Sequence, residues 1–255
     1  MNMSRIVRSL VCVVVAFLWL EAAPSLAVTF TDTDFNNGDW TATKIVDTTP
    51  GNGASFTATQ MTSGGNPSSF REVIHSYNSG AITVAHLNNA ALYNPTTAGA
   101  LSAVDFTYDI IRINPSTNAP LVGYAGLAFQ NGSYYQAPAD TLGTATWTSF
   151  SHAGLLPSNF TLVGGAGPAA PDLSATGSPI RFGYITFNAA PVGSGAITTD
   201  SGIDNWRVNT SSTSTPGTGG TPGGLSAVPE PSTWLLLSSG LTGLAAWRKI
   251  RRIGC

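Results

Sequence analysis

Hydrophobic and polar residues alternate with a period of two along most of the middle of the chain. The alternating runs are rich in Thr, Val, Ile and aromatic residues and are separated by Gly, Pro, Asn and Ser; they lie at residues 55–61, 81–87, 103–113, 121–129, 144–150, 160–163, 180–187 and 203–208. This pattern predicts half-buried strands rather than helices. Residues 28–208 are therefore predicted to form one all-β domain, an antiparallel β-sandwich.

Residues 1–27 have the parts of a secretory signal peptide. Arg5 and Arg8 give a positive start, an unbroken apolar run occupies residues 10–20, and Ser25-Leu26-Ala27 supplies the small residues that a signal peptidase reads. An apolar run of this length spans about 16 Å as a helix, which is too short for a bilayer core of about 30 Å. We expect cleavage after Ala27 and export of the chain; the alternative is an uncleaved anchor.

The composition changes abruptly after the last predicted strand. Residues 209–227 consist almost entirely of Ser, Thr, Gly and Pro, which cannot bury enough apolar surface to fold, so we interpret them as a flexible linker. Residues 228–255 then contain a Pro-Glu-Pro triplet, a short apolar segment bounded by two Trp residues, and an Arg-rich end. Interfacial Trp residues and a basic flank are typical of a membrane-inserted helix.

This ordered tail resembles the PEP-CTERM sorting signal of exported bacterial proteins. The matching features are Pro229, Glu230 and Pro231, the Leu- and Gly-rich apolar segment at 234–247, and the basic residues at 248–252. The resemblance implies that an exosortase-like enzyme processes the tail after its transient insertion in the inner membrane. It also implies release to the cell surface or to an exopolysaccharide matrix.

Three segments of the middle region are similar to parts of the jelly-roll domains that accompany such tails. They are Gly64–Arg71 (GGNPSSFR), Thr146–Thr148 (TWT) and Gly202–Val208 (GIDNWRV). Similar sandwiches include carbohydrate-binding modules and concanavalin-like lectins. The resemblance implies a jelly-roll-like arrangement of the sandwich but no particular function, because this fold hosts many.

The charges of the middle region exclude one class of partner. Only 9% of all residues are charged, and residues 28–228 contain five basic residues against eleven Asp and Glu, a net charge of −6. Such a surface repels a phosphate backbone, so we exclude nucleic-acid binding. Both cysteines, Cys12 and Cys255, fall in the end segments, so the sandwich has no disulfide or thiolate chemistry.

The sequence offers little catalytic chemistry. It contains no nucleophile elbow, zinc-binding H-E-x-x-H pair or phosphate-binding glycine loop. His75 and His86 lie in alternating runs, where a structural role is the simpler interpretation. Glu72, beside Arg71, could supply one half of a glycosidase acid pair, although a solvated strand charge is by far the simpler interpretation. We predict that the protein is not an enzyme and assign no catalytic residue.

Oxygen-bearing side chains cluster near both ends of the predicted sandwich. Asp32, Asp34 and Asn36 lie near its start, and Asp204 and Asn205 near its end. Terminal strands of a sandwich often neighbour one another, which would bring these oxygen atoms together. Hard oxygen ligands in a flexible loop suit Ca²⁺, so one hypothesis is a calcium site that staples the terminal strands. The alternative is that these residues only form Asx turns.

A second cluster suggests contacts with sugars. Tyr134 and Tyr135 follow Asn131-Gly132, a turn signal, so we expect at least one exposed ring there. With Gln130 and Asn131 as hydroxyl-binding amides, these rings form a candidate glycan site. Trp147 and Trp206 lie in predicted strands and are interpreted as core residues. Our leading hypothesis remains a non-enzymatic exported protein; a glycan-binding module and a secreted polysaccharide-active enzyme are the alternatives.

Overall fold

The computed structural model describes residues 26–51, 53–114 and 121–213. Strands dominate this part of the chain, and its single α-helix, α2, is only the short turn Pro95–Ala98. The predicted all-β fold is confirmed. Residues 1–25 of the predicted signal peptide, most of the linker and the sorting triplet at residues 229–231 lie outside the described residues, whereas Leu26 and Ala27 begin strand β1.

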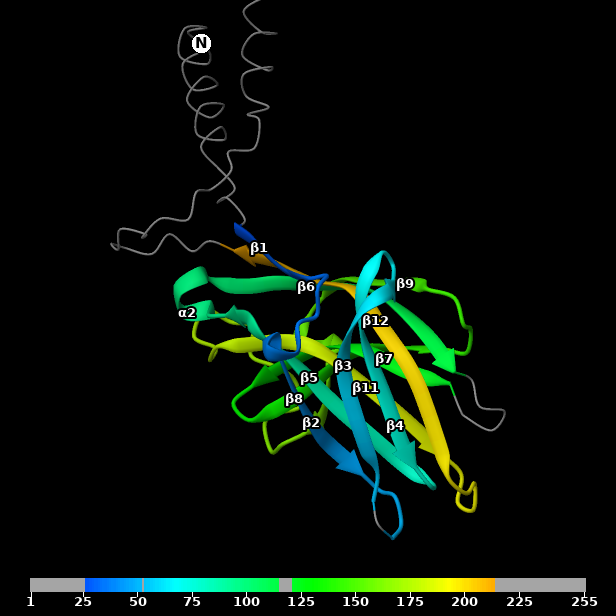
Figure 1. Cartoon of the computed structure of the whole chain (residues 1–255). Helices are drawn as coiled ribbons and strands as arrows, with labels where there is room; N and C mark the ends of the chain where they lie inside the picture. Colours follow the sequence, from blue (N-terminus) through cyan, green and yellow to red (C-terminus); the bar gives the residue numbers. More distant parts are fainter. Residues whose placement is uncertain (1–25, 52, 115–120, 214–255) are drawn as a thin grey trace, which may run out of the picture. The chain divides into compact units, whose positions relative to one another are not determined.

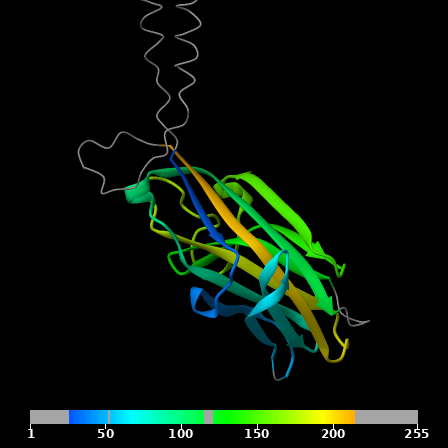
Figure 2. The same ribbon diagram turned by 45° about the horizontal axis from the view of Figure 1, so that its top comes forward.

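Twelve strands form two antiparallel sheets of six, which lie face to face (Figures 1 and 2). Sheet A has the order β3-β4-β12-β6-β9, with β1 paired to β12 in addition; its strands are β1 (Leu26–Asp32), β3 (Ser55–Gly65), β4 (Ser68–Tyr77), β6 (Ala100–Asn114), β9 (Thr148–Leu155) and β12 (Ile197–Thr213). Sheet B has the order β10-β8-β7-β11-β5-β2; its strands are β2 (Trp40–Asp47), β5 (Gly80–Tyr93), β7 (Val122–Gln130), β8 (Ser133–Leu142), β10 (Thr161–Gly164) and β11 (Ile180–Ala190).

The first and last strands of the sandwich are neighbours. β1 pairs with the final part of β12, from Leu26 opposite Ser212 to Asp32 opposite Trp206. β12 continues to Thr213, so five residues that the sequence analysis placed in the linker are strand. They were missed because they are all polar, yet Thr210 and Ser212 point inward and are buried, and the Thr210 hydroxyl donates to the Val28 carbonyl.

Aromatic side chains from both sheets fill the space between them. Phe106 of β6 meets Phe182 of β11, with ring centroids 6.1 Å apart, and Trp206 of β12 meets Trp40 of β2 at 5.1 Å. The Trp206 ring is 1% exposed, and its indole N–H donates to the Gly183 carbonyl. This agrees with its interpretation as a core residue. Inward aromatic residues of this size account for a substantial core without a disulfide.

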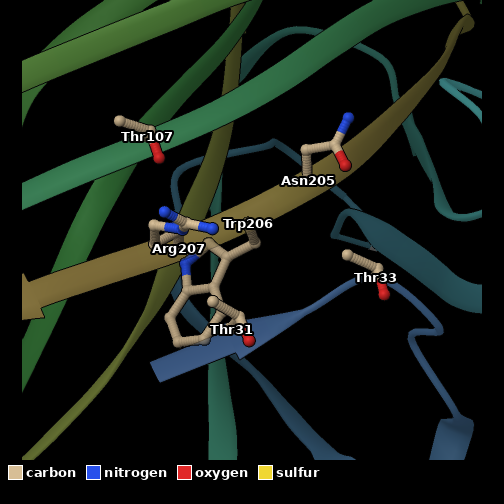
Figure 3. A pocket seen from close by; sticks show the side chains of 6 residues that line it. All are labelled: Thr31, Thr33, Thr107, Asn205, Trp206 and Arg207. Carbon is tan, nitrogen blue, oxygen red and sulfur yellow. The ribbon is translucent and has the colours of Figure 1, made fainter. Parts of the chain in front are cut away.

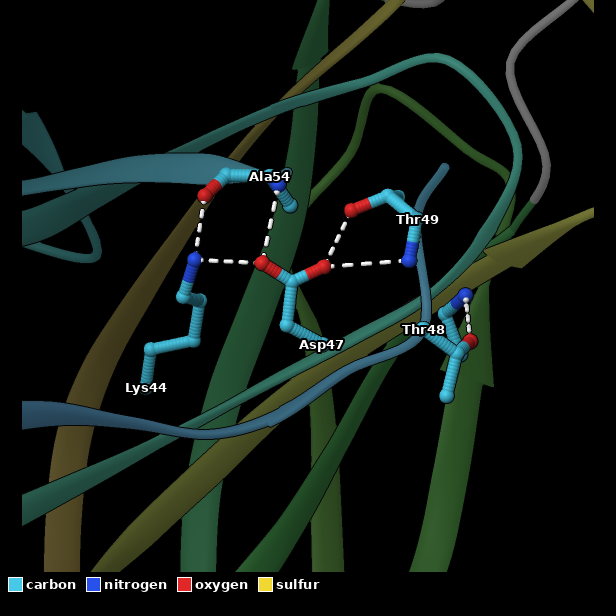
Figure 4. A network of polar contacts seen from close by, with 6 residues as sticks. Lys44, Asp47, Thr48, Thr49 and Ala54 are labelled. Carbon is cyan, nitrogen blue, oxygen red and sulfur yellow. Dashed lines mark hydrogen bonds and ion pairs between the residues drawn. The ribbon is translucent and has the colours of Figure 1, made fainter. Parts of the chain in front are cut away.

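The connection between β2 and β3 is held by one carboxylate. Asp47 accepts hydrogen bonds from the Lys44 ammonium, the Ala54 amide and the amide and hydroxyl of Thr49 (Figure 4). The Lys44 ammonium is the main cause that holds the pKa of Asp47 well below its usual range. Lys44 is the only Lys among residues 28–228, so its charge is committed to this turn.

Candidate functional site

The three segments that resemble jelly-roll domains meet in space, on the side of sheet A that faces away from sheet B. The hairpin between β3 and β4, with Gly64 and Asn66 at its tip, folds over the middle of β12. The Trp147 indole donates to the Gly64 carbonyl at 3.1 Å, and its ring packs edge-on against Phe70. Residues far apart in sequence thus build one wall on this face of the sheet.

Two carboxylates and two amides lock this hairpin to β12. The Asp204 carboxylate accepts from the backbone amides of Asn66 and Asn205. The Asn205 amide group donates to the Asn66 carbonyl and to Asp109, and the Asn66 amide group also donates to Asp109. Burial raises the pKa of Asp204. Every side chain of this cluster has a partner, so its geometry is fixed.

A pocket of about 340 Å³ lies beside this wall (Figure 3); its lining residues are Thr31, Thr33, Thr107, Asn205, Trp206 and Arg207. The pocket owes its shape to a bulge in β12. Pairing with β6 is interrupted between Asp204 and Arg207, and Asn205 adopts a left-handed φ of 51°. This conformation is more accessible to Asn than to most residues. The bulge turns the Asn205 side chain toward the outer face and Trp206 into the core.

Strand register explains which groups face the pocket. Arg207 lies directly opposite Thr31 of β1 on one side and Thr107 of β6 on the other, so these three side chains form one row on the outer face. Sequence reasoning missed all of them. Their outward positions follow from the alternation in each strand, but the row itself exists only because β1 and β6 both pair with β12.

The structure does not bring the predicted calcium ligands together. One oxygen of Asp32 accepts from the amides of Asp34 and Phe35, and the other accepts from the Trp40 indole and the Asn88 amide group. Asp204 belongs to the separate hairpin cluster. Within the described ranges, no group of three or more His, Cys, Asp or Glu side chains is placed to hold a metal ion. Asp32 and Asp204 act in this structure as acceptors for nearby N–H groups.

The side chains of the other two predicted ligands of the first segment, Asp34 and Asn36, are exposed, and the Asn36 amide group donates to Asp39.

The predicted glycan residues are also separated. Asn131 and Gly132 form a tight two-residue turn in which both residues have positive φ, so β8 restarts at once and its side chains alternate. Tyr135 therefore points inward and is 1% exposed, whereas Tyr134 points outward and packs on Phe129 at 4.7 Å. The side chain of Gln130 is buried and bonds the backbone around residues 172 and 178. Of the four predicted residues, only Asn131 is exposed.

Two of the three His residues belong to a polar chain between the sheets. The Thr186 hydroxyl bridges His75 and His86, at 3.1 Å from each Nε2 atom. His75 Nδ1 lies 2.7 Å from the Asn188 side-chain oxygen, which can only accept, so His75 carries its proton on Nδ1. Burial lowers the pKa of His75 to about 4 and holds that of His86 well below its usual value. Both imidazoles are therefore neutral at neutral pH.

The third His residue joins the two sheets near β9. His152 of β9 and the Tyr108 hydroxyl of β6 both contact the same Asp140 oxygen of β8, at 2.8 and 2.7 Å. In the part of the chain that the structure describes, no Ser or Thr hydroxyl bonds His152, so this group lacks the nucleophile of a hydrolytic triad. We interpret it as a polar clamp between the sheets.

The clamp predicts a specific pattern of stability. Asp140→Ala should lower the free energy of unfolding by about 2 kcal/mol, because it leaves the buried Tyr108 hydroxyl without an acceptor. Adding Tyr108→Phe removes that stranded hydroxyl and should recover part of the loss. Urea unfolding of both variants and of Tyr108→Phe alone measures this coupling. If the loss of unfolding free energy in the double variant equals the sum of the losses in the two single variants, the two groups are not coupled and the clamp is contradicted.

Glu72, the proposed half of an acid pair, has one acidic neighbour. It lies opposite Gly202 of β12, and its charge adds to burial in raising the pKa of nearby Asp200 to about 6. A carboxylic acid with a raised pKa beside a second carboxylate is the arrangement that a glycosidase requires. Both residues lie on the outer face of sheet A, so this pair is where the enzymatic alternative would have to operate.

The comparison with protein families gives a match in the tail. A family described as the PEP-CTERM protein-sorting motif matches residues 227–252. The comparison with curated protein sequences found no match.

Among solved structures, the C-terminal family 22 carbohydrate-binding module of Clostridium thermocellum Xyn10B is similar at 15% identity and a TM-score of 0.40; the alignment covers 73% of this chain and 96% of that one. The CBM22-1 xylan-binding domain of Paenibacillus barcinonensis Xyn10C is similar at 9% identity and a TM-score of 0.37; the alignment covers 76% of this chain and 99% of that one.

Among the residues that the structure describes, no helix is long and apolar enough to cross a membrane. The sorting motif lies outside those residues. The body of the chain is a two-sheet β-sandwich, and the PEP-CTERM sorting motif at residues 227–252 indicates an exported protein sorted by an exosortase.

Proposed function

We propose that this protein is a non-catalytic β-sandwich that its tail delivers to the cell surface or to an exopolysaccharide matrix. The observation that carries the proposal is the sorting motif at residues 227–252, which follows a folded body. The tail inserts transiently in the inner membrane, and an exosortase-like enzyme removes it. The body is then the part that acts outside the cell.

The buried positions of its titratable groups support a non-catalytic body. His75 and His86 are enclosed between the sheets, where neither can reach a substrate, and His152 is held against Asp140. The best remaining acid pair is Glu72 with Asp200. Release of reducing sugar from a polysaccharide by the wild type, lost in Glu72→Gln, would overturn this part of the proposal.

Processing at both ends is the expected result in a host that encodes an exosortase. Intact-mass analysis of the released protein should show a chain that begins at Val28 and lacks residues 234–255, because the apolar segment is removed with the tail. Replacing Pro229, Glu230 and Pro231 by Ala should leave a longer chain in the membrane fraction. A full-length chain with Cys255 as the sole stable product, in wild type and variant alike, would contradict tail-directed sorting.

A further inference from the structure

The pocket on sheet A presents polar groups that the protein itself does not use. Within the described ranges, the side chains of Thr31, Thr107 and Arg207 make no hydrogen bond or ion pair. Two residues further along the same strands, by contrast, the Thr29 hydroxyl of β1 donates to the Asn209 side chain of β12. Thr31 and Arg207 are exposed, and Thr33 adds a third free hydroxyl at the rim. Such groups are available to a ligand.

The walls of the pocket are held in place before any ligand arrives. Both donated bonds of the Asn205 amide group go to Asn66 and Asp109, which leaves its side-chain oxygen as a free acceptor that faces the Thr33 side of the pocket (Figure 3). Trp206 is anchored in the core below by its bond to Gly183. Asn205 and Trp206 therefore lose little conformational entropy when a ligand binds.

Charge decides the class of ligand. Arg207 is the only cation that lines the pocket, and Asp105 and Asp109 flank Thr107 two residues away on β6. The region 28–228 carries a net charge of −6. The carboxylates of Asp105 and Asp109 would repel an anionic ligand. The hydroxyl groups of a neutral ligand can accept hydrogen bonds from Arg207 and donate to the Asn205 side-chain oxygen, and the Thr hydroxyls can donate or accept.

We propose that this pocket binds neutral saccharide units of an extracellular polysaccharide through their hydroxyl groups. Its volume of about 340 Å³ is at the small end for ligand pockets, so it fits a short stretch of such a chain. The Trp206 ring faces the core and offers no stacking platform, so hydrogen bonds alone hold the sugar and the Kd is in the range of about 1 mM. The inference goes beyond the sorting of the tail and does not depend on it.

Saturation-transfer difference NMR suits binding of this strength. The full chain is purified in a polyoxyethylene detergent, which has no sugar headgroup, and is probed with neutral hexasaccharides of glucose, mannose and galactose and with an oligogalacturonate as the anionic probe. We expect transfer to at least one neutral probe and weaker transfer to the oligogalacturonate. Arg207→Met should weaken that binding about tenfold, and Thr107→Val about threefold.

Two matched variants control for nonspecific effects. Arg181→Met removes a cation from sheet B, and Thr59→Val removes an exposed hydroxyl from β3 of sheet A, the sheet that carries the pocket. Both variants should bind like the wild type. Absence of transfer to every neutral probe, binding confined to the oligogalacturonate, or equal losses in pocket and control variants would each overturn the proposal. Failure here leaves tail processing untouched, so the two proposals fail separately.

Discussion

Lowering the pH from 7.5 to 5 is expected to reduce the free energy of unfolding by about 3 kcal/mol, and the melting temperature by about 10 °C. The cause is the His75–Thr186–His86 chain between the sheets. An unfolded His residue binds a proton near pH 6.5, but folded His75 does so only near pH 4. Between these values the unfolded state binds more protons, so acid favours unfolding and full stability is reached above about pH 7.

The geometry explains why the folded state rejects these protons. His75 donates from Nδ1 to the Asn188 side-chain oxygen and accepts at Nε2 from the Thr186 hydroxyl. Because this hydroxyl has then donated its only proton, its oxygen accepts from His86 Nε2. His86 Nδ1 is left buried with no partner, so a proton added there would find no acceptor. The charge of buried Arg71 opposes a second positive charge nearby. His75 thus accounts for about 2 kcal/mol of the loss at pH 5. His86 adds to the loss in the same direction, because burial lowers its pKa as well.

Carboxylates oppose this trend in part. Burial raises the pKa values of Asp200 and Asp204, so their protonation in acid favours the folded state. The expected loss is therefore smaller than the sum of the two His contributions.

Urea unfolding at several pH values measures the effect. His75→Gln should remove about two-thirds of the loss between pH 7.5 and 5, and His86→Gln should also make the loss smaller. Asp200→Asn should make the loss larger, because it removes an opposing group. A stability that does not change over this range in the wild type, or changes equally in all the variants, would rule out the buried imidazoles as its source.

Asp32→Ala is expected to lower the free energy of unfolding by about 3 kcal/mol. The carboxylate of Asp32 ends β1 and accepts four N–H groups, including the indole of Trp40 at 2.7 Å from sheet B. Loss of the carboxylate leaves the buried Trp40 indole N–H without an acceptor. It also removes the hydrogen bonds that hold the turn at Phe35. Phe35 is fully buried, has a φ of 54° and stacks on Trp40. Hydrogen bonds to a charged acceptor are the stronger kind, which accounts for the size of the effect.

Asp34→Ala is the matched control, because the Asp34 carboxylate is exposed and has no partner within the described residues; it should cost at most about 0.5 kcal/mol. The same series tests the calcium hypothesis. If Asp32 works only through its N–H partners, EDTA leaves the wild-type melting temperature unchanged. A drop on chelation that Ca²⁺ reverses and Mg²⁺ does not would favour the metal instead.

Alternation predicted β6 and β11, whose inward residues are apolar. The predicted runs did not cover β1, β2, β4, β8 or the end of β12. In β4 and at the end of β12, several inward positions are polar: Arg71 and His75 in β4, Thr210 and Ser212 in β12. Their burial depends on hydrogen-bond partners from distant strands, such as Asn188 of β11 for His75. A hydropathy pattern cannot show partners of that kind.

The candidate sites illustrate the same limit. The turn at Asn131-Gly132 was predicted, but a two-residue turn returns the chain to strand so quickly that Tyr135 enters the core. Arg207 gave no signal in sequence, since a lone Arg in a strand is usually a solvated charge. Its setting depends on β1 and β6 both pairing with β12, which is a property of the topology.

The position of β12 has a consequence for the order in which the protein can assemble during export. β12 lies in the middle of sheet A, between β4 and β6, yet it is the last strand of the body to leave the ribosome. Its contacts with β1 join residues as far apart as Thr29 and Asn209, 180 positions along the chain. Pairings of such long range form late and slowly. Until residue 213 has emerged, sheet A lacks its central strand, so the sandwich cannot close before the whole body has been synthesised.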